Sequence, residues 1–302
     1  MNGAILTCIV TVSRVTPYFD RLSQLLQEVS SVEQIELIIV HDVQDENSAK
    51  LIDSIVARLP VPKITLLAGF FGNPGEARNF ALKHVTTPWL IFTDGDDRIF
   101  PDAYLKVLEG CMLDCADIAV AGIRVSDVKY PLHSSDHIVD LRVSVEESLG
   151  LMPAFTRLIY NTKFIEGLVF PSFLMAEDQC FLFSVLQRRP KFFVSDEIVY
   201  EYFTGGSTQL TASVSAINDL KRSIKYLVNS LNGIDVDLLE LGFIFVFKQM
   251  VTFVLRKRLS SILELAPLFP RLLYFCFRNP IVFLNSIRKI VFYRKALINA
   301  KG

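Results

Sequence analysis

The sequence predicts an α/β protein with a mostly parallel sheet covered by helices on both faces, followed by a helical C-terminal region. Apolar runs of strand length alternate with segments of helical periodicity through the first 125 residues, which is the pattern of βαβ units. From residue 216 on, the strand-like runs stop and helical spacing continues. We therefore expect one domain over residues 1–215 and a helical region over residues 216–302.

Five strands and four helices alternate in this prediction. The strand-like runs are rich in β-branched and apolar residues and cover 4–12, 35–40, 63–68, 89–93 and 118–125. The helical segments cover 20–29, 48–59, 75–84 and a stretch that opens at Pro101, where a missing N–H costs little. Ligands bind beyond the carboxyl ends of the strands in such sheets, so we expect the chemistry just after Val12, Val40, Ala68 and Thr93.

Composition narrows the class of protein. Of the 302 residues, 51% are hydrophobic and 21% charged, which excludes a disordered or collagen-like chain. Residues 1–220 hold 17 Lys/Arg and 28 Asp/Glu, whereas residues 221–302 hold 14 and 4. The chain therefore has an acidic body and a basic, apolar tail.

Cysteine usage and hydropathy place further bounds. The five cysteines are scattered without a CxxC pair, which argues against a disulfide scaffold or a zinc site and favours a reducing compartment. The N-terminus lacks the basic residues of a signal peptide. No run of 18 uncharged apolar residues occurs, since Lys248 interrupts the best candidate, Leu241–Leu255.

The segment WLIFTDGDDR is the sharpest feature of the sequence. A predicted buried strand ends at Thr93 and delivers Asp94, Asp96 and Asp97, with Gly95 allowing a tight bend. Carboxylates this close repel one another unless a cation or a polar network compensates, and their hard oxygens suit Mg²⁺ or Mn²⁺. The metal interpretation requires that they face a cavity and are not taken up by arginines. The alternative is a solvated turn that caps the next helix.

Asp-x-Asp after a strand also occurs in haloacid-dehalogenase-type phosphatases. That resemblance is poor here. Those enzymes carry the motif on the first strand with Thr or Val two residues further on, whereas this motif follows the fourth strand and has Arg98 at that place.

Four further segments accompany FTDGDD in a fixed order: IELIIVHDVQDENS, GNPGEARNFAL, FPSFLMAEDQCFLFSVLQ and YEYFTGGST. In this order the chain resembles a family 2 inverting glycosyltransferase with the GT-A fold, a Rossmann-like sheet, over roughly residues 4–210. The resemblance implies transfer of a sugar from a nucleotide sugar, with Mg²⁺ or Mn²⁺ as cofactor. The Gln-x-x-Arg-Trp motif of processive synthases is absent, because the only Trp is Trp89, so addition of single sugars is expected.

The resemblance also implies roles for particular residues. Asp96 would ligate the metal ion, Asp178 would be the catalytic base, and Glu177 would contact the acceptor. The expected nucleotide-sugar contacts are Thr11, Ser13, Asp42, Gly75, Arg78, Asp94 and Gly95. Asp42 would accept the uracil N3–H, which favours a UDP-sugar.

Some of these residues have structural alternatives. Asp97 could cap a helix, and Glu177 and Asp178 could be an acidic helix start. Ser207 could donate a hydrogen bond to a phosphate or simply belong to a turn. The chain also departs from the family pattern, because Val43 replaces the second of two usual aspartates and Asp20 stands where an Asn is usual. This departure keeps open a second hypothesis, a catalytically inactive nucleotide-sugar-binding or scaffold subunit.

The tail suggests where the protein works. From Glu240 to Gly302 there are 11 Lys/Arg and only 2 Asp/Glu among apolar residues, in segments cut by Pro267, Pro270 and Pro280. These segments fit amphipathic helices on an anionic membrane surface. We expect a cytoplasmic enzyme, peripheral on the inner face of a bacterial cell membrane, with a saccharide or lipid-linked acceptor. A helical subdomain or a homodimer interface is the alternative, and no base-reading motif supports nucleic-acid binding.

Overall fold

Two compact units make up the chain. The computed structural model describes residues 3–43, 46–59, 64–127, 134–137, 144–151, 154–204, 214–257 and 259–299. The first unit, here called the sheet unit, lies within residues 1–140, 154–172 and 189–209. The second, here called the helical unit, lies within 141–153, 173–188 and 210–302. The predicted division at residue 215 falls near the start of the last helical-unit segment, 210–302. The helical unit also contains the two earlier segments 141–153 and 173–188.

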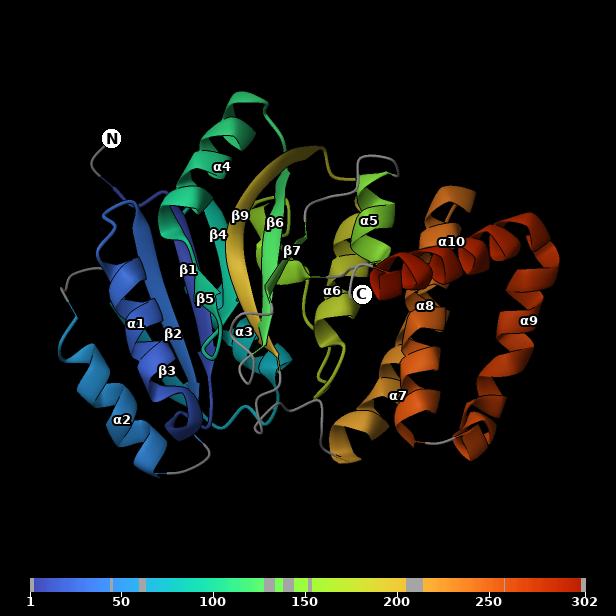
Figure 1. Ribbon diagram of the computed structural model, residues 1–302, viewed down its shortest axis with the longest axis horizontal. Helices are drawn as coiled ribbons and strands as arrows, with labels where there is room; N and C mark the ends of the chain where they lie inside the picture. The colour runs from blue at the N-terminus through green and yellow to red at the C-terminus, as the bar shows by residue number, and fades with distance from the viewer. Residues whose placement is uncertain are drawn as a thin grey trace. The chain divides into compact units, whose positions relative to one another are not determined.

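The N-terminal half of the sheet is parallel and matches the predicted strands. Its strands are β1 (Leu6–Val12), β2 (Ile35–Asp42), β3 (Ile64–Gly69) and β4 (Trp89–Asp94), in the order β3-β2-β1-β4. The helices between and after them are α1 (Phe19–Ser30), α2 (Glu46–Val56), α3 (Pro74–Leu82) and α4 (Pro101–Leu113). Figure 1 shows these helices around the sheet, with η1 (Thr16–Tyr18) leading into α1.

The other half of the sheet mixes strand directions. It continues in the order β8 (Leu158–Asn161), β6 (Ile118–Asp127), β9 (Phe192–Thr204) and β5 (Arg98–Ile99), with β7 (Ser134–His137) on β6. β8 runs antiparallel to both β4 and β6, whereas β6 and β9 are parallel. The short η2 (Phe155–Arg157) leads into β8. The predicted α/β class is confirmed, with a mixed second half that includes the expected strand 118–125.

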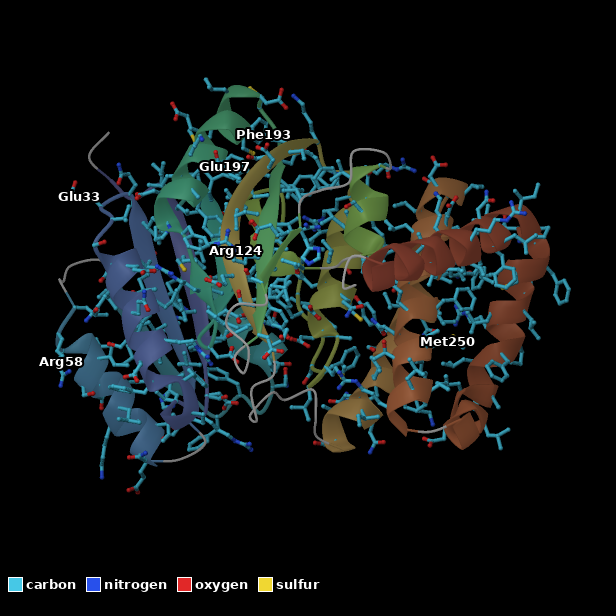
Figure 2. All side chains as sticks on the ribbon, in the orientation of Figure 1. Glu33, Arg58, Arg124, Phe193, Glu197 and Met250 are labelled. Atoms are coloured by element: carbon cyan, nitrogen blue, oxygen red, sulfur yellow. The ribbon has the colours of Figure 1, made fainter. Side chains whose placement is uncertain are left out.

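The central strands of the sheet form the core of the sheet unit. Nearly all side chains of β1 and β4 are buried, as expected for parallel strands covered on both faces. α4 packs on β9, where Gly110 leaves room for the ring of Phe193 and Lys106 pairs with Glu197. Figure 2 shows Phe193 and Glu197 on β9 beside this helix.

The helical unit is built around one long helix. Its elements are α5 (Val145–Leu151), α6 (Glu177–Leu186), α7 (Val214–Ser230), α8 (Val236–Lys257), η4 (Leu259–Leu268), α9 (Phe269–Arg278) and α10 (Pro280–Asn299). The expected helical character beyond residue 216 is therefore present. The middle of α8 is buried on all sides, because the consecutive residues Phe243, Ile244, Phe245 and Val246 are all buried.

α8 also has the dimensions of a membrane span. Residues Val236–Arg256 are long and apolar enough to cross a bilayer, with a mean hydropathy of 1.9 over the best window, and half of that window is buried inside the protein. No other helix among the described residues passes this test. The central helix of a soluble domain has the same length and composition, so length and hydropathy do not distinguish the two.

Candidate functional site

Strands β1 and β4 end side by side at the point where the chain order in the sheet reverses. β2 and β3 lie on one side of β1 and β4 lies on the other, which makes this edge the topological switch point. Thr11 is in register with Asp94, and the Gly95 N–H donates to the Thr11 carbonyl at 3.0 Å. A Cβ on Gly95 would lie 2.4 Å from Cγ1 of Val12. Glycine is therefore needed here to bring the acidic loop against β1.

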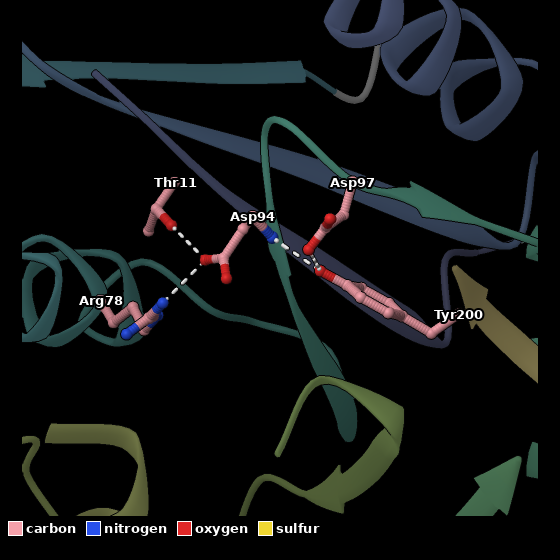
Figure 3. Close-up of polar contacts among 5 residues, drawn as sticks. All are labelled: Thr11, Arg78, Asp94, Asp97 and Tyr200. Atoms are coloured by element: carbon pink, nitrogen blue, oxygen red, sulfur yellow. Dashed lines mark hydrogen bonds and ion pairs between the residues drawn. The ribbon is translucent and has the colours of Figure 1, made fainter. Parts of the chain in front are cut away.

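Asp94 is held from two sides. Its Oδ1 accepts a hydrogen bond from Arg78 at 2.8 Å and from the Thr11 hydroxyl at 3.2 Å, as Figure 3 shows. The Arg78 guanidinium is 3% exposed and lies over the rings of Phe155 and Phe170, at 4.6 and 5.4 Å. The three residues predicted from separate segments, Thr11, Arg78 and Asp94, thus form one cluster.

Asp97 anchors the same loop to β9. Its carboxylate accepts a hydrogen bond from the Tyr200 hydroxyl at 2.6 Å and from the Phe203 N–H at 2.9 Å. The Tyr200 oxygen in turn accepts from the Asp94 N–H at 3.4 Å (Figure 3). Burial, with the nearby charges of Asp96 and Asp94, raises the pKa of Asp97 well above its ordinary value. Asp97 therefore fixes the loop, and the helix-capping alternative is not what the structure shows.

Asp96 is the remaining carboxylate of the loop. Partial burial, with the charge of Asp94 adding to it, raises the pKa of Asp96 to about 6. Its own backbone amide and the charge of Arg21 lower that pKa, but less. The Arg21 guanidinium lies 5.0 Å from the centre of the Phe203 ring. The metal interpretation required that arginines do not occupy the carboxylates of the loop. Asp94 does not meet this condition, because it forms an ion pair with Arg78.

The donor set of this loop fits a divalent cation. A cation beside Asp96 would relieve the repulsion between two partly desolvated carboxylates. Mg²⁺ commonly takes only one or two carboxylates from the protein and completes its shell with water and substrate phosphates. Within the described ranges, no group of three or more His, Cys, Asp or Glu side chains is arranged to hold a metal ion. A site with one or two protein carboxylates is still compatible with Mg²⁺, because water and phosphate oxygens supply its other ligands.

Comparison with known proteins decides the family. Residues 10–184 match the family model described as Glycosyl transferase family 2, which covers more than half of the chain. The chain belongs to glycosyl transferase family 2. This membership confirms the resemblance to family 2 and rules out the phosphatase alternative, while inversion stays a prediction.

Solved structures agree with the fold. The Staphylococcus aureus TarS 1-349 structure in complex with UDP-GlcNAc has a TM-score of 0.67 and 15% identity, over 96% of this chain and 92% of that one. The mannosyltransferase PcManGT from Pyrobaculum calidifontis, in complex with GDP-Man and Mn²⁺, has a TM-score of 0.56 and 15% identity, over 96% and 86%. At this identity the likeness establishes the GT-A fold alone.

A curated relative matches a shorter stretch. The succinoglycan biosynthesis protein ExoO of Rhizobium meliloti (strain 1021) is 32% identical over 104 residues. That stretch is 34% of this chain and 28% of the relative.

Asp42 of this family 2 enzyme ends β2 and orders the loop after β3. Its Oδ1 accepts from the Phe71 N–H at 2.9 Å and the Gly72 N–H at 3.4 Å. Gly72 has φ of +74°, a conformation that favours glycine. Asp42 is therefore a loop-organising residue, and its contact with a nucleobase stays a prediction.

The start of α3 packs against the segment 154–172 of the same sheet unit. Asn73 caps α3 by accepting from the Glu76 N–H at 2.9 Å. A Cβ on Gly75 would lie 2.6 Å from the Pro171 carbonyl oxygen. Asn79 exchanges two hydrogen bonds of 2.8 Å with the backbone of Phe170. Gly75 thus has a packing role here, and its nucleotide contact stays a prediction.

Ser13 lies just beyond β1 and contacts Tyr18, a residue that was not predicted from the sequence. Its N–H donates to the Tyr18 hydroxyl at 3.3 Å. Burial raises the pKa of Tyr18 to about 12, and the charges of Asp96 and Asp94 add to the rise, so this phenol lies near the acidic loop. Tyr200 and Arg21 were missed too. The segment YEYFTGGST begins at Tyr200, but no spacing rule links that residue to Asp97.

Glu177 and Asp178 open α6 in the helical unit. Glu177 is buried, and Ala176 before it has φ of 63°, in the left-handed region. Their charges raise the pKa of the buried Cys180 thiol further, after the larger effect of burial itself. The acidic helix start is present as expected, while the roles in acceptor binding and base catalysis stay predictions. Ser207 lies outside the described residues.

Proposed function

We propose that this family 2 glycosyltransferase transfers a single sugar from a UDP-sugar to a saccharide or lipid-linked acceptor in surface polysaccharide biosynthesis, with inversion and with a divalent metal ion. One observation carries the proposal. The loop Asp94–Asp97 lies at the topological switch point with one carboxylate fixed by Arg78 and Thr11 and a second, Asp96, partly buried with a raised pKa. Three similar proteins support the proposal. TarS was solved with UDP-GlcNAc, PcManGT was solved with GDP-Man and Mn²⁺, and ExoO is a succinoglycan biosynthesis protein.

The sheet-unit residues would bind the donor. Asp96 would hold Mg²⁺ or Mn²⁺, which when bound neutralises the charge that develops on the leaving diphosphate. Asp94, which is held by Arg78 and Thr11, would accept a hydrogen bond from a ribose hydroxyl. Asp42 would accept the uracil N3–H. Because Asp94 is already oriented, little side-chain entropy is lost when the donor binds.

Asp178 would supply the base. It would take the proton of the acceptor hydroxyl as that oxygen attacks the anomeric carbon from the face opposite the leaving group. The new glycosidic C–O bond forms while the bond to the diphosphate breaks, so the anomeric configuration inverts. UDP leaves with the electron pair of the broken bond.

The direct test is metal-dependent hydrolysis of UDP-sugars, because glycosyltransferases hydrolyse their donors slowly without an acceptor. We expect UDP release by the wild type with Mn²⁺, lost by at least about 100-fold in Asp96→Ala. Asp102→Ala is the matched control, because Asp102 is an exposed carboxylate in the first turn of α4. Full activity of Asp96→Ala would refute the metal role of Asp96. Wild-type transfer by Asp178→Asn would refute the choice of base.

The second hypothesis, an inactive nucleotide-sugar-binding or scaffold subunit, rests on Val43 and the altered segment after β2. It predicts that UDP stabilises the fold while no UDP-sugar is consumed under any metal condition. Hydrolysis that depends on Mn²⁺ would reject it.

A further inference from the structure

Two C-terminal helices expose an apolar face. On α9 the exposed apolar residues are Leu273, Tyr274 and Phe277, and on α10 they are Ile281, Leu284, Ile287 and Val291. We call these seven residues the outer face. Phe277 and Ile281, on either side of the junction between the helices, are 80% and 73% exposed. Side chains this large, gathered on two adjacent helices, mark an interaction surface more often than scattered exposed residues do.

The opposite side of the same helices is firmly packed. Leu272 and Phe275 of α9 are buried. The ring of Phe283 of α10 packs against the rings of Phe243 and Phe247 of α8, with centroid distances of 6.0 and 5.5 Å. Lys289 forms an ion pair of 2.5 Å with Glu240 of α8. The two helices are therefore packed into the helical unit on one side. Figure 1 shows α9 beyond α8 at the edge of that unit.

Positive charge accompanies the outer face. Residues 269–302 contain seven Lys/Arg and no Asp or Glu. Arg278 and Arg288 are exposed on the two helices. The Arg278 guanidinium donates to the Tyr274 hydroxyl at 2.7 Å and lies 5.6 Å from the centre of that ring. Aromatic and aliphatic side chains beside arginines form the composition of a helix that lies in a bilayer interface.

We propose that the outer face of α9 and α10 is a docking surface for an anionic lipid bilayer, with the helices lying in the interfacial plane. α9 has 10 residues, so it reaches only about 15 Å and cannot cross a bilayer. α10 carries four basic residues from its middle onward, which excludes a spanning position; they are Arg288, Lys289, Arg294 and Lys295.

A second copy of this chain is a poorer occupant of the same surface. A twofold interface would bring identical faces together. The arginines of one outer face would then meet those of the other without a carboxylate from residues 269–302 to pair with. Anionic headgroups supply the missing negative charge.

The test is flotation of the full-length protein with lipid vesicles. We expect binding to vesicles that contain 30% phosphatidylglycerol and at least about tenfold weaker binding to pure phosphatidylcholine, with the difference shrinking as NaCl rises. Phe277→Ser should weaken binding about tenfold. The double change Arg278→Gln and Arg288→Gln should weaken binding about 30-fold, because each basic residue near an anionic surface contributes about one factor of five.

Matched controls come from the sheet unit. Leu113→Ser removes a residue that is also 80% exposed, and Arg58→Gln removes an exposed arginine on the loop after α2, labelled in Figure 2. Both should bind like the wild type, and unchanged circular dichroism would show that every variant folds. Equal binding to both vesicle types, no vesicle binding, or self-association abolished by Phe277→Ser would each overturn the proposal. Neither donor nor acceptor is present, so the outcome does not depend on the proposed reaction.

Discussion

At the scale of single residues, the acidic loop shows a division of labour among three aspartates. Asp94 is ion-paired with Arg78, and Asp97 is hydrogen-bonded to Tyr200 and Phe203 of β9. Asp96 alone combines partial burial with a strongly raised pKa. Such a group destabilises the folded protein in its ionised form, which is a typical cost of a binding site.

The raised pKa of Asp96 gives a pH-dependent prediction. The pKa of Asp96 is about 6 in the folded protein against an ordinary value of 3.8, so the folded state binds the proton more tightly. Stability without metal is therefore expected to fall as pH rises from about 4 to 6, and the loss persists at pH 7. Asp96→Asn should remove this penalty and stabilise the metal-free protein by about 1–2 kcal/mol at pH 7, with little change at pH 4.

Urea unfolding at pH 4 and pH 7 measures this difference. Asp102→Asn is the control at an exposed position and should change neither value by more than about 0.5 kcal/mol. A destabilised Asp96→Asn protein at pH 7 would show that the carboxylate is held by favourable contacts and is not poised for a cation.

At the scale of elements, the site depends on the close approach of β1 and the loop after β4. The Gly95 N–H bonds to Thr11, and Cγ1 of Val12 occupies the space that a side chain at residue 95 would need. The two strands are parallel and in register from Leu6 to Thr11, so a shift at this edge would move Thr11 away from Asp94. The switch point is thus set by a steric fit between neighbouring strands.

A double-mutant cycle tests that fit. Gly95→Ala should cost about 1–3 kcal/mol of unfolding free energy, because its Cβ would meet Cγ1 of Val12 at 2.4 Å. Val12→Ala removes that carbon, so the double variant should be more stable than the sum of the single effects predicts, by at least about 0.5 kcal/mol. Chemical denaturation of the four proteins gives the coupling. Strict additivity would mean that the loop relaxes in another way.

At the scale of the whole molecule, a ligand that binds only the folded state raises the melting temperature by mass action. We expect UDP with Mn²⁺ to stabilise the protein by about 2.7 kcal/mol when UDP is present at 100 times its dissociation constant. UDP without metal should give a smaller shift, and Asp96→Ala should abolish the difference between the two conditions.

Thermal unfolding with UDP, GDP and ADP, each with and without Mn²⁺, measures these shifts. A larger response to GDP than to UDP would contradict the assignment of Asp42 to uracil. A shift that is the same with and without Mn²⁺ would contradict the metal role.

The amino-acid sequence was enough to predict the alternating strands and helices, the acidic loop after the fourth strand, and the helical tail. These follow from local periodicity and from residue types at fixed spacing, which a single sequence contains. It also led to the family, because several motifs occur in one order.

The partners of the acidic-loop residues became known only from the folded chain. Arg78 and Asp94 are 16 residues apart, and Tyr200 and Asp97 are 103 apart, and no local pattern encodes such pairs. The packing roles of Gly75 and Gly95 likewise depend on Pro171 and Val12, which the fold brings close. The outer face of α9 and α10 became visible only when burial showed which side of each helix packs into the helical unit. The sequence did not show it, because alternating apolar and basic residues fit a packed helix and an exposed one equally well.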